Sequence, residues 1–484
     1  MAKDFIVAIE LGSSKITGMA GKKNPDGSIT ILAAASEDST SYIRKGVVYS
    51  IDKTTQGLSN IISKLKNSLQ ADITQVYVGI GGQSIHSVKN MVIKDLPMDA
   101  IVSQNMVNEL MDSNRNMTYP DYEIQDAITE EYKVDLQYQN DPVGIQASRL
   151  EGNFLNILWR RSFYRNLNKS FDNAGIAIAE TYLAPLVMAD NVLTEAEKRA
   201  GCVLVDLGAE TTTVSVYYRD KLRSIAVIPL GGDNITKDLE SLQMEASEAE
   251  RMKLKYSSAI TDVADIDPTA ILPIDSNRSV ESRRFIEVVE ARTLEIIENV
   301  KSFIPSEYID KLLGGIILTG GGSNMTNIDK AFREITGVEK VRIAKFVTLN
   351  INSKDSKPEL RHDGTMNTIL SLIARGDMNC AGNPFGNSLF DNQQFNAVFT
   401  TTGTTNGTTT TQPNATTPHE TEEERIKREE KERIAKEEAE RIKQEEETRK
   451  AKEEEERKKN SPIHRFFGSL KQFGRSLVEP ENNE

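Results

Sequence analysis

The sequence is poor in the residues that build metal sites and disulfide frameworks. Its 484 residues include two cysteines, Cys202 and Cys380, and four histidines that lie far apart in the chain. Two cysteines outside a C-x-x-C pair cannot build a disulfide framework and are typical of a reducing cytosolic compartment. The scattered histidines argue against a histidine-rich metal site.

Long apolar runs and excess positive charge are missing as well. No stretch approaches the roughly 20 apolar residues that a membrane-spanning helix needs. The first residues enter a strand-like run at positions 5–9 with acids on both sides, which does not resemble a cleavable signal. A net charge of −13 disfavours nucleic acid as a partner, because an acidic protein repels it at long range.

Beyond residue 376 the composition changes three times. Residues 400–417 contain 11 threonines, and we expect a disordered linker over 377–419. Residues 420–459 carry 17 glutamates and 14 lysines or arginines, repeatedly with glutamate four residues before a base. This spacing stabilises a helix, so we predict a single charged spacer helix over 420–460, with a coiled coil as the alternative.

The segment 461–484 is predicted to be an amphipathic helix. Pro462 suits a first helical position, and residues 462–478 contain three Lys/Arg and no acid. Large apolar residues on one face with flanking cations are typical of a helix that lies in the plane of an anionic lipid surface. Docking on the protein body or on a partner is the alternative. The predicted membrane contacts are Ile463, Arg465, Phe466, Phe467, Leu470, Lys471, Phe473, Arg475 and Leu477.

The body of the chain contains one pattern twice. Residues 7–17 align with residues 203–213, at an offset of 196. In each copy a β-branched run ends in a carboxylate, Glu10 or Asp206, and a glycine, small or hydroxyl residues and a second apolar run follow. The repeat predicts a duplicated domain with mixed sheets.

The repeated turn has a chemical use. Gly12 and Gly208 let a hairpin approach a phosphate closely, N–H groups and hydroxyls donate to its oxygens, and the carboxylate can hold Mg²⁺ through water. A third element, the buried run before residues 320–322, would let a nucleoside lie against glycine backbone. An ordinary strand-to-helix loop is the alternative for this third element.

Four motifs in this order carry a family resemblance: V-A-I-E-L-G-S-S-K, V-L-V-D-L-G-A-E-T-T-T, A-E-R-M-K-L-K-Y and I-I-L-T-G-G-G-S. They resemble the actin-type ATPases and, among these, the FtsA family of bacterial cell-division proteins, over residues 1 to about 376. The resemblance implies an α/β fold: a duplicated actin-like (ribonuclease-H-like) ATPase with two lobes, a nucleotide cleft, a small inserted α/β subdomain and a C-terminal tail that ends in the amphipathic helix.

The resemblance also implies boundaries and ligands. The first actin-like subdomain would comprise 1–82, 164–199 and 345–376, the insert 83–163, the second subdomain 200–235 and 316–344, and an adenosine-contacting and FtsZ-contacting subdomain 236–315. ATP would bind with Mg²⁺ at Glu10 and Asp206. The implied nucleotide-binding residues are Gly12, Ser13, Ser14, Lys15, Gly208, Thr211, Thr212, Thr213, Glu250, Lys253, Gly320, Gly321, Gly322 and Ser323. We assign no catalytic base.

The implied function is a filament-forming cell-division protein with slow ATP hydrolysis, for which ATP is a polymerisation switch. It would anchor the FtsZ ring, through the FtsZ C-terminal peptide, to the cytoplasmic face of the cell inner membrane and recruit later division proteins. A sugar- or acetate-kinase-type phosphotransferase of the same superfamily is the alternative, but it has no use for a lipid-binding tail. A chaperone ATPase would carry a peptide-binding β domain after the ATPase.

Two further expectations concern single residues. Ala209 and Glu210 stand where the family has glycines, and a carboxylate at 210 would repel a triphosphate unless it faces solvent or joins Mg²⁺. The helical stretch 281–304 contains Phe285, Val289, Ile296, Val300 and Phe303, which we expect in the core.

Overall fold

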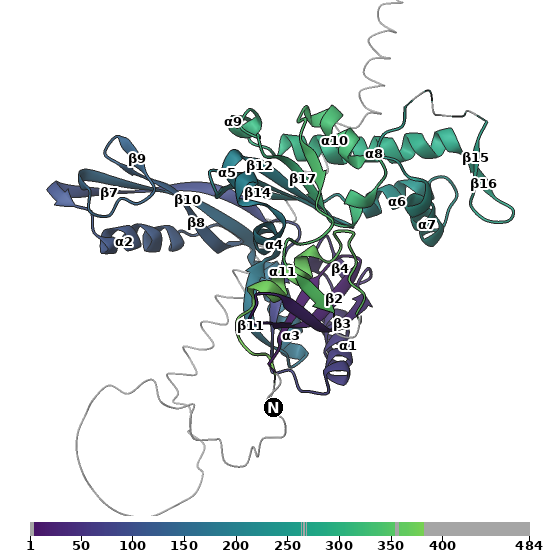
Figure 1. The fold of residues 1–484 in the computed structure, drawn as a ribbon, viewed down its shortest axis with the longest axis horizontal. Coiled ribbons are helices and arrows are strands. Elements are labelled where there is room, and N and C mark those ends of the chain that lie inside the picture. Colours follow the sequence, from purple (N-terminus) through teal and green to yellow (C-terminus); the bar gives the residue numbers. More distant parts are fainter. Residues whose placement is uncertain (1–3, 263, 265–266, 268, 354–357, 382–484) are drawn as a thin grey trace, which may run out of the picture. The chain divides into compact units, whose positions relative to one another are not determined.

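The computed structural model describes residues 4–381 except 263, 265–266, 268 and 354–357 (Figure 1). The predicted spacer helix, the predicted membrane helix and most of the predicted linker lie outside the described residues. Within the described part, no helix combines the length and apolar character needed to cross a membrane.

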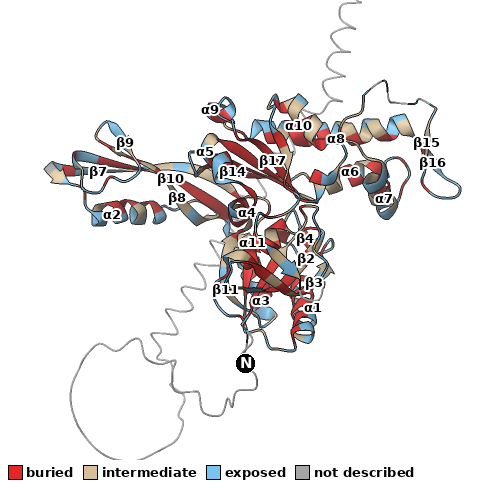
Figure 2. Ribbon diagram, viewed as in Figure 1, coloured by how far each residue is buried: buried red, intermediate tan, exposed pale blue. Residues whose placement is uncertain are grey.

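The first lobe is built on a six-stranded sheet in the order β11-β6-β1-β2-β3-β19. Strands β1 (Ile6–Leu11), β2 (Lys15–Lys23) and β3 (Ile29–Asp38) are antiparallel, and β6 (Gln75–Ile80) lies parallel to β1. The outer strands are β11 (Ala177–Leu183) and β19 (Ile351–Ser353). The buried strand centres, red in Figure 2, form the core of this lobe.

Helices cover both faces of this sheet. Helix α1 (Ile51–Leu69) packs with α3 (Arg161–Asn173), and α4 (Ala184–Val192) packs with α11 (Asn367–Arg375). Small residues in β2 allow close approach, because a Cβ at Gly18 would meet Ile61 of α1 and one at Gly21 would meet Ile373 of α11. The hairpin of β4 (Ile43–Arg44) and β5 (Val47–Val48) precedes α1.

The second lobe repeats this plan. Its strands run in the order β18-β17-β12-β13-β14, with β12 (Cys202–Leu207), β13 (Thr212–Tyr218) and β14 (Lys221–Ile228) antiparallel. Strand β17 (Gly315–Thr319) lies parallel to β12, as β6 does to β1, and β18 (Val341–Ile343) follows. Two sheets with the same strand order confirm the duplicated two-lobed α/β fold predicted from the repeated sequence.

Helices complete the second lobe. Helices α6 (Gly232–Glu240), α7 (Ala246–Tyr256) and α8 (Ser282–Ser302) share a separate apolar cluster beside the short strands β15 (Ile271–Pro273) and β16 (Ser279–Glu281). Helix α8 buries four of the five predicted core residues, but the prediction is wrong for Phe303, which is 44% exposed. Phe303 is the C-cap of α8 and its N–H still donates to Asn299 O (3.2 Å), so it keeps its place on the helix although its side chain is exposed.

The other helices of this region are short. Helix α5 (Glu195–Ala200) precedes β12, and α9 (Ser306–Ile309) lies between α8 and β17. A 3₁₀ turn, η2 (Gly321–Asn324), leads from β17 towards α10 (Ile328–Thr336).

An inserted subdomain follows β6. It consists of β7 (His86–Ile101), α2 (Gln104–Arg115), β8 (Tyr122–Val134), β9 (Gln137–Gln139) and β10 (Gln146–Arg160). Its chain leaves and re-enters the first lobe, yet its sheet continues that of the second, in the order β14-β7-β10-β8-β9 (Figure 1). Backbone N–H groups of Val227 and Ile225 donate to Ile85 O (3.1 Å) and Ser87 Oγ (2.9 Å) at this junction.

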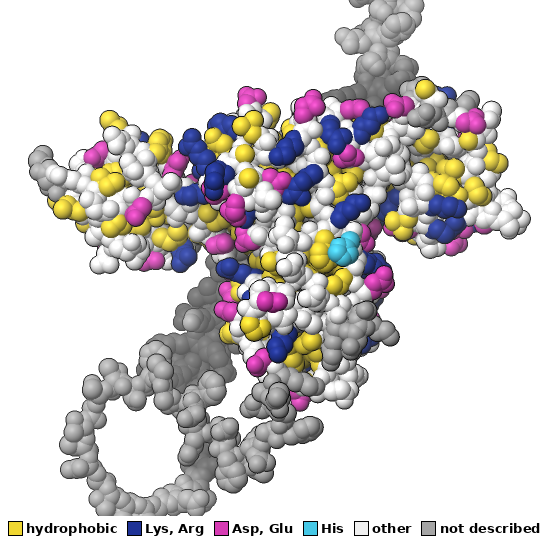
Figure 3. Space-filling view, in the orientation of Figure 1, with side chains coloured by type: hydrophobic (Ala, Val, Ile, Leu, Met, Phe, Trp, Pro, Cys, Tyr) yellow, Lys and Arg dark blue, Asp and Glu magenta, His cyan; other side chains and the backbone are white. Residues whose placement is uncertain are grey.

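The described chain ends against the first lobe. Cys380 N donates to Phe5 O (2.8 Å) and Cys380 O accepts from Thr74 N (3.0 Å), so residues 377–381, which we assigned to the linker, contact β1 and β6 at their starts. Acidic, basic and apolar side chains are intermixed on the face in Figure 3. The net negative charge therefore does not form one acidic surface on this face.

Candidate functional site

The two predicted phosphate hairpins have the same local geometry. Gly12 N donates to Lys15 O (3.0 Å), and Gly208 N donates to Thr211 O (2.9 Å). A Cβ at either glycine would lie 2.8 Å from the same carbonyl oxygen of its own hairpin. Both turns therefore require glycine, and the equivalence extends from sequence to backbone hydrogen bonding.

The carboxylates that precede these turns have raised pKa values. Burial, followed by the charge of Asp206, raises the pKa of Glu10 to about 7, although Lys15 and the Thr368 hydroxyl oppose the shift. Burial raises the pKa of Asp206 to about 6. Two carboxylates whose charged forms are disfavoured in this way fit a divalent cation, which would stabilise both charged forms.

A metal ion would need ligands from outside the protein as well. Among the described residues no group of three or more His, Cys, Asp or Glu side chains is arranged to hold a metal. Glu10 and Asp206 therefore provide at most two carboxylates, and phosphate oxygens and water would complete an Mg²⁺ coordination sphere.

The third predicted element packs directly on the second hairpin. Gly320 has φ +82°, and a Cβ there would lie 2.3 Å from Asp206 Oδ1 and 2.6 Å from Leu207 O. The buried Ser323 hydroxyl donates to Gly320 O (2.7 Å), so it stabilises the turn of residues 320–324. Asn324 Nδ2 donates to Asp363 O (2.7 Å), which joins this turn to the segment before α11. The end of β17 therefore lies beside Asp206.

Glu250 and Lys253 belong to α7, and their side chains contact the start of α6. Lys253 Nζ donates to Gly232 O (3.0 Å) and Thr236 Oγ1 (2.9 Å) and pairs with Glu250 Oε2 (2.6 Å). Gly232 N in turn donates to Gly208 O (3.0 Å). The implied nucleotide-binding residues Glu250 and Lys253 are therefore connected through α6 to the second phosphate hairpin, and each holds the side chain of the other in place.

The predicted hydroxyl and lysine contacts are not equivalent. Ser14 is exposed, whereas Lys15 and Thr211 are half-buried. The buried Ser13 hydroxyl accepts a hydrogen bond from Gly46 N (2.8 Å) and keeps its own proton free to donate. Thr212 Oγ1 donates to Leu230 O (2.9 Å), so this hydroxyl proton is already used within the protein. The Thr213 side chain is buried.

Sequence reasoning missed the contribution of Lys45. Its backbone N donates to Glu210 Oε2 (2.6 Å), while Glu210 Oε1 lies 3.4 Å from Lys237 Nζ. The Glu210 side chain is 18% exposed. The carboxylate whose placement the sequence left open therefore does not simply face solvent: it has two protein partners, one in each lobe. The separation of 165 residues left no local signal for this contact.

Known proteins resemble this chain closely enough to show its family. A cell division protein FtsA of Porphyromonas gingivalis is 32% identical over 352 residues, which cover 71% of this chain and 74% of the relative. The chain belongs to the FtsA family of cell-division proteins. A second FtsA, of Neisseria meningitidis, is 30% identical over 335 residues, with 67% and 80% covered.

Family models match two parts of the FtsA-type chain. The model described as cell division protein FtsA matches residues 203–360, and the model for the SHS2 domain inserted in FtsA matches residues 82–158. The second match falls on the subdomain β7 to β10. Among solved structures, a PilM-PilN type IV pilus biogenesis complex aligns with a TM-score of 0.52 at 14% identity, with 76% of this chain and 98% of the other covered, which supports the actin-like fold alone.

Proposed function

We propose that this FtsA-family protein is an ATP-binding, actin-like filament protein that anchors the FtsZ ring to the cytoplasmic face of the inner membrane and recruits later division proteins. The observation that carries the proposal is the pair of equivalent hairpins, each with a carboxylate, Glu10 or Asp206, one residue before the end of its first strand. Their glycine turns and the raised pKa values of both carboxyl groups suit a polyphosphate with Mg²⁺.

Each part of the cleft would have its own role in nucleotide binding. Gly12 and Gly208, whose own amides are bonded within the turns, would let a phosphate approach the backbone closely, and Ser13, Ser14, Lys15 and Thr211 would donate to its oxygens. Glu250 and Lys253 would contact the nucleoside, and the glycines at 320–322 would leave room beside it. When bound, Mg²⁺ would neutralise phosphate charge. ATP would favour the closed, polymerising form, and slow hydrolysis would reset it.

The tail supplies the membrane contact in this proposal. One short amphipathic helix over 461–484 binds lipid modestly, but a filament presents many copies, and avidity multiplies apparent affinity by ~10²–10⁴. The charged segment 420–460 would set the distance between filament and bilayer. Polymerisation and membrane attachment are therefore expected to depend on each other.

The partners are assigned to separate surfaces. The insert, over 83–163, would contact the neighbouring subunit and later division proteins. Large apolar side chains are exposed at the edge strand β9 in support of this assignment. Tyr138 of β9 is 61% exposed, and Leu136, which directly precedes the strand, is 86% exposed. The FtsZ C-terminal peptide would bind the subdomain 236–315. This surface exposes Leu254 (77%) and Ile271 (65%), which suits a peptide with apolar anchors.

Electron microscopy on lipid monolayers tests the proposal as a whole. The full-length chain should form filaments on anionic lipid with ATP and few without it. Deletion of 461–484, or Phe466→Glu with Phe467→Glu, should abolish liposome pelleting and leave ATP affinity unchanged. Filaments that bind lipid equally well without the tail would contradict the tether.

A peptide-binding assay tests the FtsZ contact. The C-terminal peptide of FtsZ should bind the full-length chain, and Leu254→Glu or Ile271→Glu should weaken it at least tenfold, because each places a charge in an apolar contact. Leu136→Glu, an exposed apolar position on the insert, is the matched control. Binding that changes only with the control would place the peptide site elsewhere.

A further inference from the structure

Two consecutive backbone amides in the first lobe contact the two phosphate hairpins. Gly46 N donates to Ser13 Oγ of the first hairpin (2.8 Å), and Lys45 N donates to Glu210 Oε2 of the second (2.6 Å). Lys45 and Gly46 form the turn between β4 and β5, outside both hairpins. This turn therefore joins the two lobes at the phosphate end of the site.

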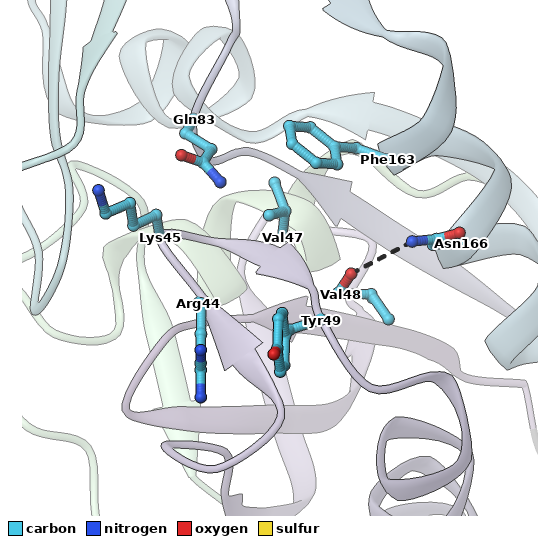
Figure 4. Close-up of a pocket in the computed structure, with 8 residues that line it drawn as sticks. All are labelled: Arg44, Lys45, Val47, Val48, Tyr49, Gln83, Phe163 and Asn166. Carbon is cyan, nitrogen blue, oxygen red and sulfur yellow. Dashed lines mark hydrogen bonds between the residues drawn. The ribbon is translucent and has the colours of Figure 1, made fainter. Parts of the chain in front are cut away.

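The turn also contacts the segment between β6 and β7. Gly46 (φ +73°) packs on Gly82 (φ +96°) so closely that a Cβ at Gly46 would lie 2.5 Å from Gly82 Cα. Gln83 N donates to Lys45 O (2.8 Å). Figure 4 shows Lys45 and Gln83 on the wall of a pocket of about 320 Å³, so the turn is anchored through its backbone while its side chains border open space. The direction of the Lys45 N–H is thus fixed by the first lobe.

Glu210 is equally well fixed within the second lobe. Its hairpin is bound to the start of α6, where Asp233 N donates to Ala209 O (2.7 Å), and Lys237 of the same helix lies beside the carboxylate. A carboxylate that accepts from a backbone N–H forms a short, charge-assisted hydrogen bond. Since donor and acceptor are each held by a different lobe, this bond can persist only while the lobes are closed at this end.

Lys237 changes the electrostatic expectation for this position. An isolated carboxylate beside a polyphosphate would repel it, but the nearby ammonium group balances the charge of Glu210. Removal of Glu210 would leave Lys237 without this carboxylate, so that its charge would attract phosphate more strongly. The same removal would also break the hydrogen bond to Lys45 N that connects the lobes. Charge and closure thus predict opposite effects on nucleotide release.

We propose that Glu210 is a positioning residue, a clasp that holds the two lobes closed over the phosphate end of the cleft by its bond to Lys45 N. Its effect on nucleotide release rests on the proposed ATP binding, whereas its effect on lobe closure does not. The clasp would make closure partly independent of nucleotide and slow the escape of ATP.

Lobe closure is measured first, without nucleotide. Spin labels on Asn67→Cys in α1 and Glu240→Cys in α6 report the distance between the lobes by pulsed electron resonance in the full-length chain. Both substituted positions are exposed, whereas the native Cys202 and Cys380 are buried. Glu210→Ala should broaden the distance distribution, and Glu210→Gln, whose amide oxygen still accepts from Lys45 N, should largely restore it. An unchanged distribution in Glu210→Ala would overturn the clasp.

Nucleotide release is measured second, with a fluorescent ATP analogue in a stopped-flow displacement. Glu210→Ala should release it about tenfold faster, the loss expected for one charge-assisted hydrogen bond. Lys237→Ala should have a smaller effect, and Glu298→Gln, an exposed carboxylate on α8, should have none. Unchanged or slower release from Glu210→Ala would show that repulsion, not closure, is the main effect of Glu210 and would overturn the clasp.

The two measurements separate the inference from the proposed function. If the wild-type chain fails to bind the analogue, the proposed ATP binding fails, while the label distances still decide the clasp. If the wild-type chain binds the analogue and neither distance nor release changes in Glu210→Ala, the clasp alone fails.

Discussion

Glu10 and Asp206 occupy the same place in two equivalent hairpins, one residue before the end of the first strand, and the negative charge of Asp206 adds to the burial that raises the pKa of Glu10 to about 7. Their repulsion couples the charges of the two lobes at one point. Without a cation, closure of the lobes brings like charges together, whereas with Mg²⁺ the same closure is favourable. Metal and nucleotide binding should therefore promote closure jointly.

Asp206→Asn should weaken Mg-ATP binding by at least tenfold, because the substitution removes one of two carboxylates that would hold the metal. Isothermal titration with Mg-ATP, and with ATP in excess EDTA, measures the effect. The loss should be large with Mg²⁺ and small without it. Glu298→Gln removes the same charge from an exposed site on α8 and should change neither affinity. Equal Mg-ATP affinities for Asp206→Asn and the wild type would exclude the metal role.

The hairpins could be predicted because their signal is local. Strand, carboxylate, glycine and second strand lie within about a dozen residues, and the pattern occurs twice, so sequence alone indicates both the turn and the duplicated fold. The contact of Glu210 with Lys45 has no such signal, because 165 residues separate the partners and a backbone N–H is the donor. Only the closed arrangement of two lobes brings them together.

The place of the insert in the sheets was also beyond sequence reasoning. Chain order connects it to the first lobe, but its sheet joins the second at one residue pair, Ala226 and His86. That pairing depends on the position of β14, which the sequence of the insert does not encode. The error at Phe303 has a different cause: helical spacing predicts the face of α8 on which a residue lies, but not whether that face is still covered at the C-cap.

Gly320→Ala should destabilise the protein more than Gly27→Ala, although both glycines have φ +82°. The backbone strain, about 1–2 kcal/mol, is common to both. At Gly320 the new methyl group would also lie 2.6 Å from Leu207 O, whereas at Gly27 no atom lies within 4 Å. Urea unfolding measures the difference, with the single tryptophan, Trp159, as the fluorescent reporter. Equal losses would show that the turn at 320 relaxes without cost.

The stability of the second lobe should fall at low pH through Glu197. Burial raises its pKa, but two hydrogen bonds from Arg342, both 2.7 Å, and the capping contact with Thr194 N lower it to about 2. Because the folded-state pKa is depressed, the stabilisation is present above the ordinary value of 4.5 and is lost as the pH falls towards 2.

This contribution is at most about 3 kcal/mol by linkage. Glu197→Gln should lower the free energy of unfolding at pH 7 and flatten its decline between pH 5 and pH 2. Glu195→Gln, in the same helix but 73% exposed, is the matched control and should leave the pH profile unchanged. A profile of Glu197→Gln that parallels the wild type would contradict the assignment.

The buried ion pair between Arg223 of β14 and Glu130 of β8 should hold the insert to the second lobe. Its atoms lie 3.3 Å apart and both side chains are under 9% exposed. Arg223→Ala leaves a buried carboxylate unpaired, which costs about 3 kcal/mol or more. Arg199→Ala breaks an ion pair of the same length with Asp220, but those side chains are 72% and 44% exposed, so the cost should stay below about 1 kcal/mol.

A double variant separates the ionic contact from packing at this junction. Arg223→Met with Glu130→Met removes both charges and keeps apolar volume, so it should recover most of the stability lost in Arg223→Ala. Urea unfolding measures stability, and limited proteolysis of native protein measures local opening of the insert. Arg223→Ala should speed cleavage within β7 to β10 relative to both the double variant and Arg199→Ala. If all three variants are cleaved at the wild-type rate, the sheet pairing alone holds the insert and the ion pair contributes nothing to its attachment.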